Sequence, residues 1–128
     1  MIVLDTGILI AFAKPDDAHH RGVTRFLSEF SGEPFSVTPI TLAEALIHPV
    51  RGDVVGETLK VLMPLGLHVT EVNEFDAAAF ARVRAATGLK MPDALVIHTA
   101  ERYGGSVATT DARLAAAAES RGLVVHQI

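Results

Sequence analysis

The sequence predicts an α/β protein in which a mainly parallel, five-stranded sheet carries helices on both faces, as a three-layer α/β/α sandwich. Three observations predict it. Short apolar runs alternate along the chain with segments of helical spacing, the connections between them are short, and the first run, Ile2–Leu4, is apolar at every position. Such a run is typical of a strand buried on both faces of a parallel sheet. We expect one domain over residues 1–128.

Each predicted strand is a short apolar run bounded by turn residues, and each predicted helix is a segment with apolar side chains at helical spacing. Strands are expected at 2–4, 35–38, 67–72, 106–110 and 123–126. Helices are expected at 8–12, 19–30, 39–48, 53–65, 74–87, 92–103 and 111–121. This order, with no internal repeat and no linker, implies parallel strands joined by right-handed crossovers.

Turn residues delimit the elements of the first half. The segment KPDD at 14–17 interrupts the helical spacing that follows the first strand, and SGEP at 31–34 ends the next helix. Pro39 is placed to open the third helix, because a proline at the first helical position loses no needed hydrogen bond. We expect Pro49 and Gly52 to close that helix.

Glycine and proline also delimit the second half. Gly88 is expected to stop the helix that begins near Glu74, and Pro92 to open the next one. Gly104 then ends that helix before the strand SVATT, and the acid that follows the strand, Asp111, begins the last helix.

Composition limits the function classes. The 128 residues are 49% apolar and 20% charged, which is ordinary for a globular chain able to bury roughly two thirds of its unfolded surface. The absence of cysteine excludes disulfides, thiolate metal sites and cysteine nucleophiles. A net charge of -4 argues against binding nucleic acid through a broad basic surface. We see no signal peptide and no run of membrane-spanning length, so we expect a cytoplasmic protein.

Four acids are candidates for a shared site. Asp5 and Asp111 directly follow the first and fourth strands, and parallel strands present their carboxyl ends at one edge of a sheet, where ligands bind. Glu44 and Asp93 lie near the starts of helices that the same edge should present. The four carboxylates are therefore expected to meet in one cleft.

Each acid also has a purely structural interpretation. Asp5 and Asp111 stand where helices begin, and aspartate is a favoured N-cap residue. Glu44 lies three residues after Thr41 and could complete a capping box, while Asp93 could simply favour a first helical turn. These alternatives stay open for each acid taken alone.

Taken together, the acids predict a metal site. Carboxylates crowded into one cleft repel one another unless a hard cation such as Mg²⁺ or Mn²⁺ neutralises them. The hydroxyl groups of Thr6 and Thr109 could orient the ligands or a bound water. Such an ion keeps open positions for phosphate oxygens, which is the chemistry of metal-assisted phosphodiester hydrolysis.

The motifs IVLDTG, TLAEAL, KMPDAL and VATTD, in this order across nearly the whole chain, resemble those of PIN-domain ribonucleases, most closely the VapC toxins of bacterial toxin-antitoxin pairs. The resemblance implies a Rossmann-like sandwich whose acidic pocket binds one or two Mg²⁺ or Mn²⁺ ions and activates water to cut RNA, thereby inhibiting translation and growth. Carried over by position, the metal-binding and catalytic acids are Asp5, Glu44, Asp93 and Asp111, with the hydroxyls of Thr6 and Thr109 behind them.

The resemblance also implies partners. Family members usually pair with a small VapB-type antitoxin encoded beside them, which inserts a segment near the active site, and they commonly form homodimers. Leu114 stands where the family often has an aromatic residue, and no further acid follows Asp111 closely, so the number of ions stays open. Lys90 and Arg113 adjoin two of the acids and could hold the RNA backbone.

Three rival functions remain to be weighed. An aspartic protease could share the DTG motif, but that chemistry occurs on β-rich folds and leaves Asp93 and Asp111 without a role. A phosphate-transferring hydrolase with Asp5 as nucleophile would typically have a second aspartate where this chain has Gly7. A non-catalytic α/β binding module, with the acids acting only as helix caps, is the third alternative.

Overall fold

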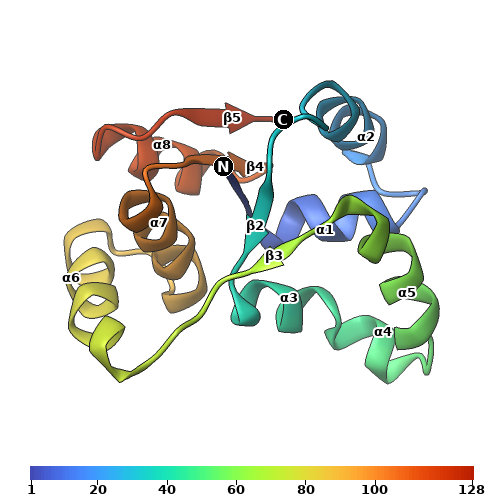
Figure 1. Cartoon of the computed structure of the whole chain (residues 1–128), viewed down its shortest axis with the longest axis horizontal. Helices are drawn as coiled ribbons and strands as arrows, with labels where there is room; N and C mark the ends of the chain where they lie inside the picture. The colour runs from blue at the N-terminus through green and yellow to red at the C-terminus, as the bar shows by residue number, and fades with distance from the viewer.

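Five strands form one central sheet in the computed structural model, which describes residues 1–128 (Figure 1). They are β1 (Ile2–Leu4), β2 (Phe35–Val37), β3 (His68–Val69), β4 (Ser106–Thr109) and β5 (Val125–Gln127). Their order across the sheet is β3-β2-β1-β4-β5, and every neighbouring pair is parallel. The predicted α/β fold with a five-stranded parallel sheet is confirmed.

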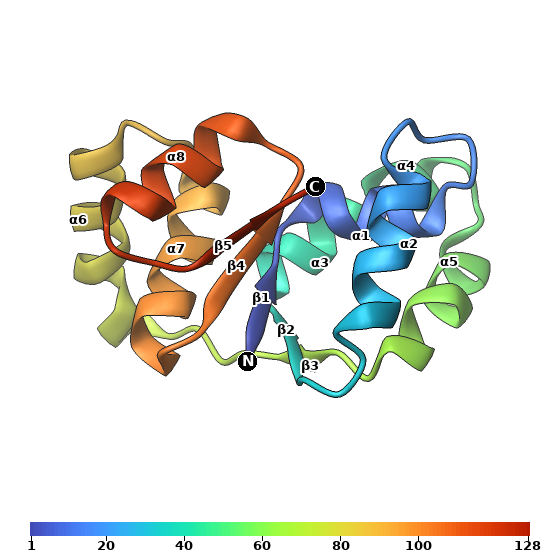
Figure 2. The ribbon, with the colours of Figure 1, turned by 90° about the horizontal axis from the view of Figure 1, so that it is seen from above.

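Helices cover the sheet on both sides. They are α1 (Thr6–Ala13), α2 (His20–Glu29), α3 (Pro39–Ala45), α4 (Ile47–Arg51), α5 (Val55–Leu62), α6 (Ala77–Thr87), α7 (Met91–Tyr103) and α8 (Ala112–Ser120), with 3-10 turns at Met63–Leu65 and Glu74–Asp76. Seen from above, α6, α7 and α8 lie on one side of the sheet, and α1, α2, α4 and α5 lie on the other (Figure 2). None of the helices combines the length and apolar character that a membrane crossing requires.

The central strand divides the core between the two layers. Side chains of a strand alternate between its faces, so Ile2 and Leu4 enter the cluster packed against α1 and α2, whereas Val3 enters the cluster built with α6, α7 and α8. All three are fully buried. This explains why the first strand is apolar at every position.

The predicted helix over 39–48 is divided, and the prediction that Pro49 closes it is wrong. Helix α3 ends at Ala45, and a new helix, α4, begins at Ile47 and contains Pro49. A proline cannot donate a backbone hydrogen bond to the residue four positions before it, which would be Ala45 in a continuous helix. Restarting at Ile47 places Pro49 in a first turn, where the missing N–H has no intrahelical partner to lose.

The edge strands are shorter than predicted. The run expected at 67–72 pairs only at His68 and Val69, both exposed, because β3 is an edge strand with a neighbour on one side. At the other edge the strand lies at Val125–Gln127, slightly later than the expected 123–126. Both changes leave the central strands β1 and β4 adjacent, in the register Leu4 to Ala108.

Candidate metal centre

Asp5 leaves β1 and immediately caps α1. Its Oδ1 accepts a hydrogen bond from the backbone N–H of Thr6 (2.7 Å), and its Oδ2 accepts one from the hydroxyl of Thr109 (2.8 Å). The residue is only 7% exposed. Burial raises its pKa to about 6; the two hydrogen bonds oppose that rise, and the charges of Asp93 and Asp111 add to it. Asp5 is thus a helix cap, as one interpretation predicted, and also a carboxylate whose ionised form loses solvation by water through burial.

Thr109 connects Asp5 to Asp111. Its buried hydroxyl donates to Asp5 and accepts a hydrogen bond from the backbone N–H of Asp111 (3.0 Å). Asp111 is exposed and caps α8, with Oδ1 accepting from the N–H groups of Arg113 (2.8 Å) and Leu114 (3.3 Å). One hydroxyl therefore joins residues more than 100 positions apart, and its role in orienting metal ligands stays a prediction.

Thr6 and Gly7 complete the same corner. Thr6 contacts Asp5 through its backbone N–H, and its hydroxyl makes no hydrogen bond, so a ligand-orienting role for that hydroxyl stays a prediction. A Cβ at Gly7 would lie 2.5 Å from the hydroxyl oxygen of Thr110. The glycine therefore lets the segment after β4 approach the first turn of α1, which brings Asp111 toward Asp5. Sequence reasoning missed Thr110, because nothing local reveals this packing.

The alternative of a capping box for Glu44 is wrong. Thr38 caps α3 instead, with its hydroxyl accepting from the backbone N–H of Thr41 (3.0 Å). The Oε1 atom of Glu44 is buried and has no hydrogen-bond partner. Burial raises the pKa of Glu44, the charge of Asp93 raises it further, and Lys90 opposes the rise. Glu44 thus neither caps a helix nor has a hydrogen-bond partner for its buried carboxylate oxygen.

Asp93 links the four acids. It lies half-buried in the first turn of α7, where it makes no capping hydrogen bond. Burial raises its pKa, followed by the charge of Asp111, while Lys90 and Arg113 lower it. Asp93 also raises the pKa values of Asp5 and Glu44. All four predicted acids therefore belong to one electrostatic cluster at the carboxyl edge of the sheet.

The cluster fits a hard divalent cation that keeps part of its water. No group of three or more acidic, histidine or cysteine side chains is arranged to hold a metal ion in this structure, so water would have to supply part of the ligands of any ion bound here. Mg²⁺ and Mn²⁺ suit this situation, because they prefer carboxylate oxygens and Mg²⁺ usually retains several waters. The Oε1 atom of Glu44 is buried and has no hydrogen-bond partner, so it is an acceptor that remains available to a cation.

Removing the Thr109 hydroxyl is expected to weaken the centre without dismantling the fold. Thr109→Val leaves Oδ2 of Asp5 and the N–H of Asp111 without their partner, which costs about 1–3 kcal/mol. The affinity for Mn²⁺ should fall roughly tenfold, as is usual when a ligand loses its supporting contact. Thr109→Ser keeps the hydroxyl and should stay close to the parent in urea unfolding and in affinity for Mn²⁺. Equal behaviour of the two variants would contradict this role.

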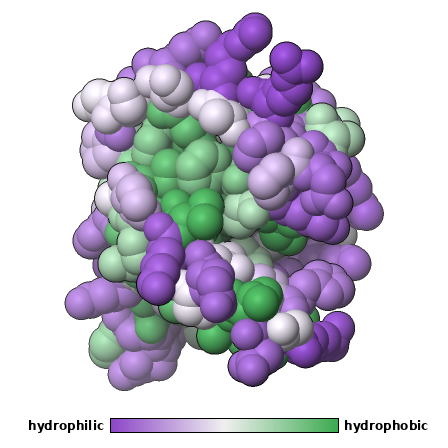
Figure 3. All heavy atoms as spheres, turned by 90° about the vertical axis from the view of Figure 1, so that its right-hand side faces the viewer, coloured by the Kyte–Doolittle hydropathy of each residue, from purple (hydrophilic) through white to green (hydrophobic).

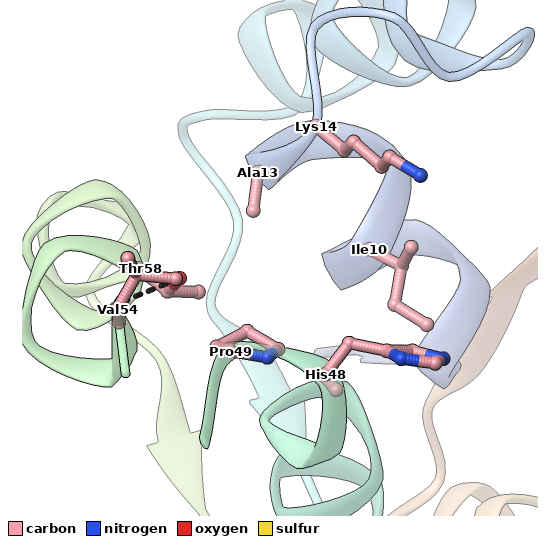
Figure 4. A pocket seen from close by; sticks show the side chains of 8 residues that line it. Ile10, Ala13, Lys14, His48, Pro49, Val54 and Thr58 are labelled. Carbon is pink, nitrogen blue, oxygen red and sulfur yellow. Dashed lines mark hydrogen bonds between the residues drawn. The ribbon is translucent and has the colours of Figure 1, made fainter. Parts of the chain in front are cut away.

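One cavity of the molecule is lined by none of the four acids. Apolar side chains gather on the face of the molecule that carries α4 and α5, and hydrophilic ones surround them (Figure 3). The cavity, of about 410 Å³, is lined by Ile10, Ala13, Lys14, Ala45, His48, Pro49, Val54 and Thr58. Lys14 and His48 lie on one side of it, opposite Val54 and Thr58 (Figure 4). Ala45 adjoins Glu44 in α3, so the cavity and the cluster share a helix.

Comparison with known proteins gives consistent results. The family model described as PIN domain matches residues 2–120. Ribonuclease VapC39 from Mycobacterium tuberculosis is 28% identical, over 95% of this chain and 96% of its own length. A toxin-antitoxin complex from Klebsiella pneumoniae superposes with a TM-score of 0.76 at 21% identity, covering 100% of both chains. FitAcB from Neisseria gonorrhoeae superposes with a TM-score of 0.77 at 24% identity, over 99% and 97% of the two chains.

Proposed function

Because the chain belongs to the PIN-domain family, we propose that it is a metal-dependent endoribonuclease and the toxin of a toxin-antitoxin pair. The observation that carries the proposal is the set of Asp5, Glu44, Asp93 and Asp111 at the carboxyl edge of the sheet: Thr109 joins Asp5 to Asp111, and burial together with the charge of Asp93 raises the pKa values of Asp5 and Glu44. Similarity to a ribonuclease along nearly the full length of both chains supports the reaction. Similarity of fold to a chain from a toxin-antitoxin complex supports the biological role.

In this proposal Asp5, Asp93 and Asp111 hold a Mg²⁺ or Mn²⁺ ion, with Glu44 beside them. When bound, the ion polarises the scissile phosphate and lowers the pKa of a coordinated water. Asp5 is the most firmly positioned of the acids, because both of its oxygens are anchored by hydrogen bonds. Further lone pairs on those oxygens remain available to a cation.

The carboxylates also take part in proton transfer during the reaction. As water adds to phosphorus and one P–O bond of the RNA backbone breaks, the water must lose a proton and the departing oxygen must gain one. Glu44 is one candidate base, because burial raises its pKa and it is neither a helix cap nor one of the three acids assigned to the ion; Asp93, whose pKa burial raises in the absence of metal, is the other. Which of the two acts can be resolved by comparing the pH profiles of Glu44→Gln and Asp93→Asn.

The direct test is cleavage by the purified chain. We expect it to cut RNA in millimolar Mn²⁺ or Mg²⁺ and to stop cutting in excess chelator, with activity restored by added metal. Expression without its antitoxin should arrest growth. Inactivity toward total RNA, transfer RNA and ribosomal RNA in either metal, together with unimpaired growth on expression, would contradict the proposal and favour the non-catalytic binding module.

The partner proposed to restrain this activity is a small antitoxin that occupies the cavity between α1, α4 and α5. The cavity offers apolar walls from Ile10 and Val54, and basic side chains, Lys14 and His48, on one side. It therefore suits a segment that presents an aliphatic or aromatic side chain together with a carboxylate. Ala45 lines the cavity and Glu44 precedes it on α3, so the antitoxin segment and the acidic cluster would contact the same helix.

A charge placed in the cavity should separate binding from catalysis. Val54→Glu introduces a carboxylate into the apolar wall, so the variant should cleave RNA like the parent but escape inhibition by the small protein encoded beside it. Val61→Glu is the matched control, because Val61 is 43% exposed against 44% for Val54 and does not line the cavity. Inhibition should be measured by titrating the partner into the cleavage assay. Unchanged inhibition of Val54→Glu would place the partner elsewhere.

A further inference from the structure

The turn between α6 and α7 is held rigidly from two sides. Gly88 ends α6 in the left-handed conformation (φ 70°), which glycine adopts without strain. The guanidinium of Arg84 donates to the carbonyl of Leu89 (2.8 Å), and that of Arg113 donates to the carbonyl of Gly88 (3.2 Å). Leu89 is buried in the core. The backbone that precedes Asp93 therefore has little freedom.

Lys90 is the next residue on this fixed turn. Its carbonyl accepts from the backbone N–H of Ala94 (3.0 Å), so its backbone belongs to the start of α7. Its side chain is exposed and makes no hydrogen bond and no ion pair with any acid. Even so, its charge lowers the pKa values of both Glu44 and Asp93. Lys90 thus stands three residues before Asp93 at the start of α7, on a turn that two arginines hold, with its ammonium free of hydrogen bonds.

The negative charge of the four acids favours a cationic side chain beside them. Four ionised carboxylates carry four negative charges, one divalent ion offsets two, and an RNA phosphate adds one more. Arg113 also lowers the pKa of Asp93, but its guanidinium is engaged with the carbonyl of Gly88. Lys90 is a cation near the cluster whose side chain makes no hydrogen bond or ion pair within the chain.

We propose that the ammonium of Lys90 contacts a non-bridging oxygen of the scissile RNA phosphate and supplies there the positive charge that a second divalent ion would bring, so that the chain works with one ion. The inference rests on the proposed ribonuclease function. A lysine suits this task because its ammonium is a compact charge on a flexible stem that can follow the phosphate as negative charge develops on it. It also accounts for the lack of a further acid close after Asp111.

The test compares Lys90→Ala and Lys90→Arg with the parent, and uses Lys60→Ala, an exposed lysine on α5, as control. Calorimetric titration with Mn²⁺ alone measures stoichiometry and affinity, and single-turnover cleavage measures the chemical step. We expect one Mn²⁺ per parent chain. Lys90→Ala should bind Mn²⁺ roughly fivefold more tightly, because a nearby positive charge is gone, yet cleave about a hundredfold more slowly.

Opposite changes in metal affinity and in rate distinguish this role from a structural one. Lys90→Arg should recover much of the rate because it keeps the charge, and Lys60→Ala should match the parent in both measurements. Two tightly bound Mn²⁺ ions per parent chain, an undiminished rate in Lys90→Ala, or a joint fall of affinity, rate and melting temperature in that variant would each overturn the inference. A parent that cleaves no RNA would overturn the proposed function as well, whereas an active parent with an equally active Lys90→Ala overturns only the role of Lys90.

Discussion

Asp5→Asn should lower RNA cleavage about a thousandfold or more while leaving the chain folded. Loss of charge stabilisation worth several kcal/mol in the transition state corresponds to such a factor. Asparagine keeps an Oδ1 atom that can accept from the N–H of Thr6, and it is as good an N-cap as aspartate. What changes is the charge, and the amide that replaces Oδ2 now faces the hydroxyl of Thr109.

The measurement pairs single-turnover cleavage in Mn²⁺ with thermal unfolding in chelator and in Mn²⁺. The parent's melting temperature should rise with Mn²⁺, because a ligand that binds only the folded state stabilises it, and that of Asp5→Asn should not. Asp16→Asn, which neutralises an exposed aspartate before α2, is the control and should behave like the parent. If Asp5→Asn cleaves at the parental rate, or melts far below the parent in chelator, Asp5 is a helix cap and not a metal ligand.

Without divalent metal, the chain should become less stable as the pH rises from about 4 to about 7. Burial raises the pKa of Asp5 from 3.8 to about 6 in the folded state, so the folded chain holds this proton more tightly than the unfolded chain. The stabilisation is complete below the unfolded pKa and is lost as the pH rises through the folded one. A shift of about two units corresponds to about 3 kcal/mol at neutral pH.

Comparing the parent with Asp5→Asn isolates this contribution from other acids. Asp76, for example, has a lowered pKa, mainly because its carboxylate accepts from the N–H of Asn73, so its contribution is lost at low pH, in the opposite direction. Urea unfolding in chelator should give equal stabilities near pH 4, and at pH 7 the variant should be the more stable by up to about 3 kcal/mol. Added Mn²⁺ should reverse the order at pH 7. If the unfolding free energies of the parent and of Asp5→Asn changed with pH in parallel, burial would not destabilise the ionised form of Asp5.

The fold was largely readable from local patterns. The uninterrupted apolar run Ile2–Leu4 marked the central strand, and Pro39 and Gly88 marked a helix start and a helix end where the structure has them. These features depend on backbone sterics and on burial, which act within a few residues. The prediction that Pro49 closes a helix was wrong because a helix accepts proline in its first turn. Pro49 lies in such a turn because α4 restarts at Ile47.

The candidate site could be predicted from the sequence only in part. Parallel strands predicted that Asp5 and Asp111 would share an edge, and the helix starts expected at the same edge added Glu44 and Asp93. The choice between cap and ligand could not be read locally, since Asp5 and Asp111 do cap helices. For Glu44 the decision came from Thr38, which took the capping role assigned to Thr41 and left a buried carboxylate oxygen without a partner.

By itself the sequence determined which segments become strands and helices and which acids stand at the ends of strands, because periodicity, proline and glycine act through the local backbone. The tertiary structure alone decided that β1 lies beside β4, that the hydroxyl of Thr109 reaches Asp5, and that two arginines hold the turn carrying Lys90. It also decided the burial that raises the pKa of Asp5. These properties arise from contacts between distant segments, whose distances and desolvation exist only once the sheet and its two helical layers have packed.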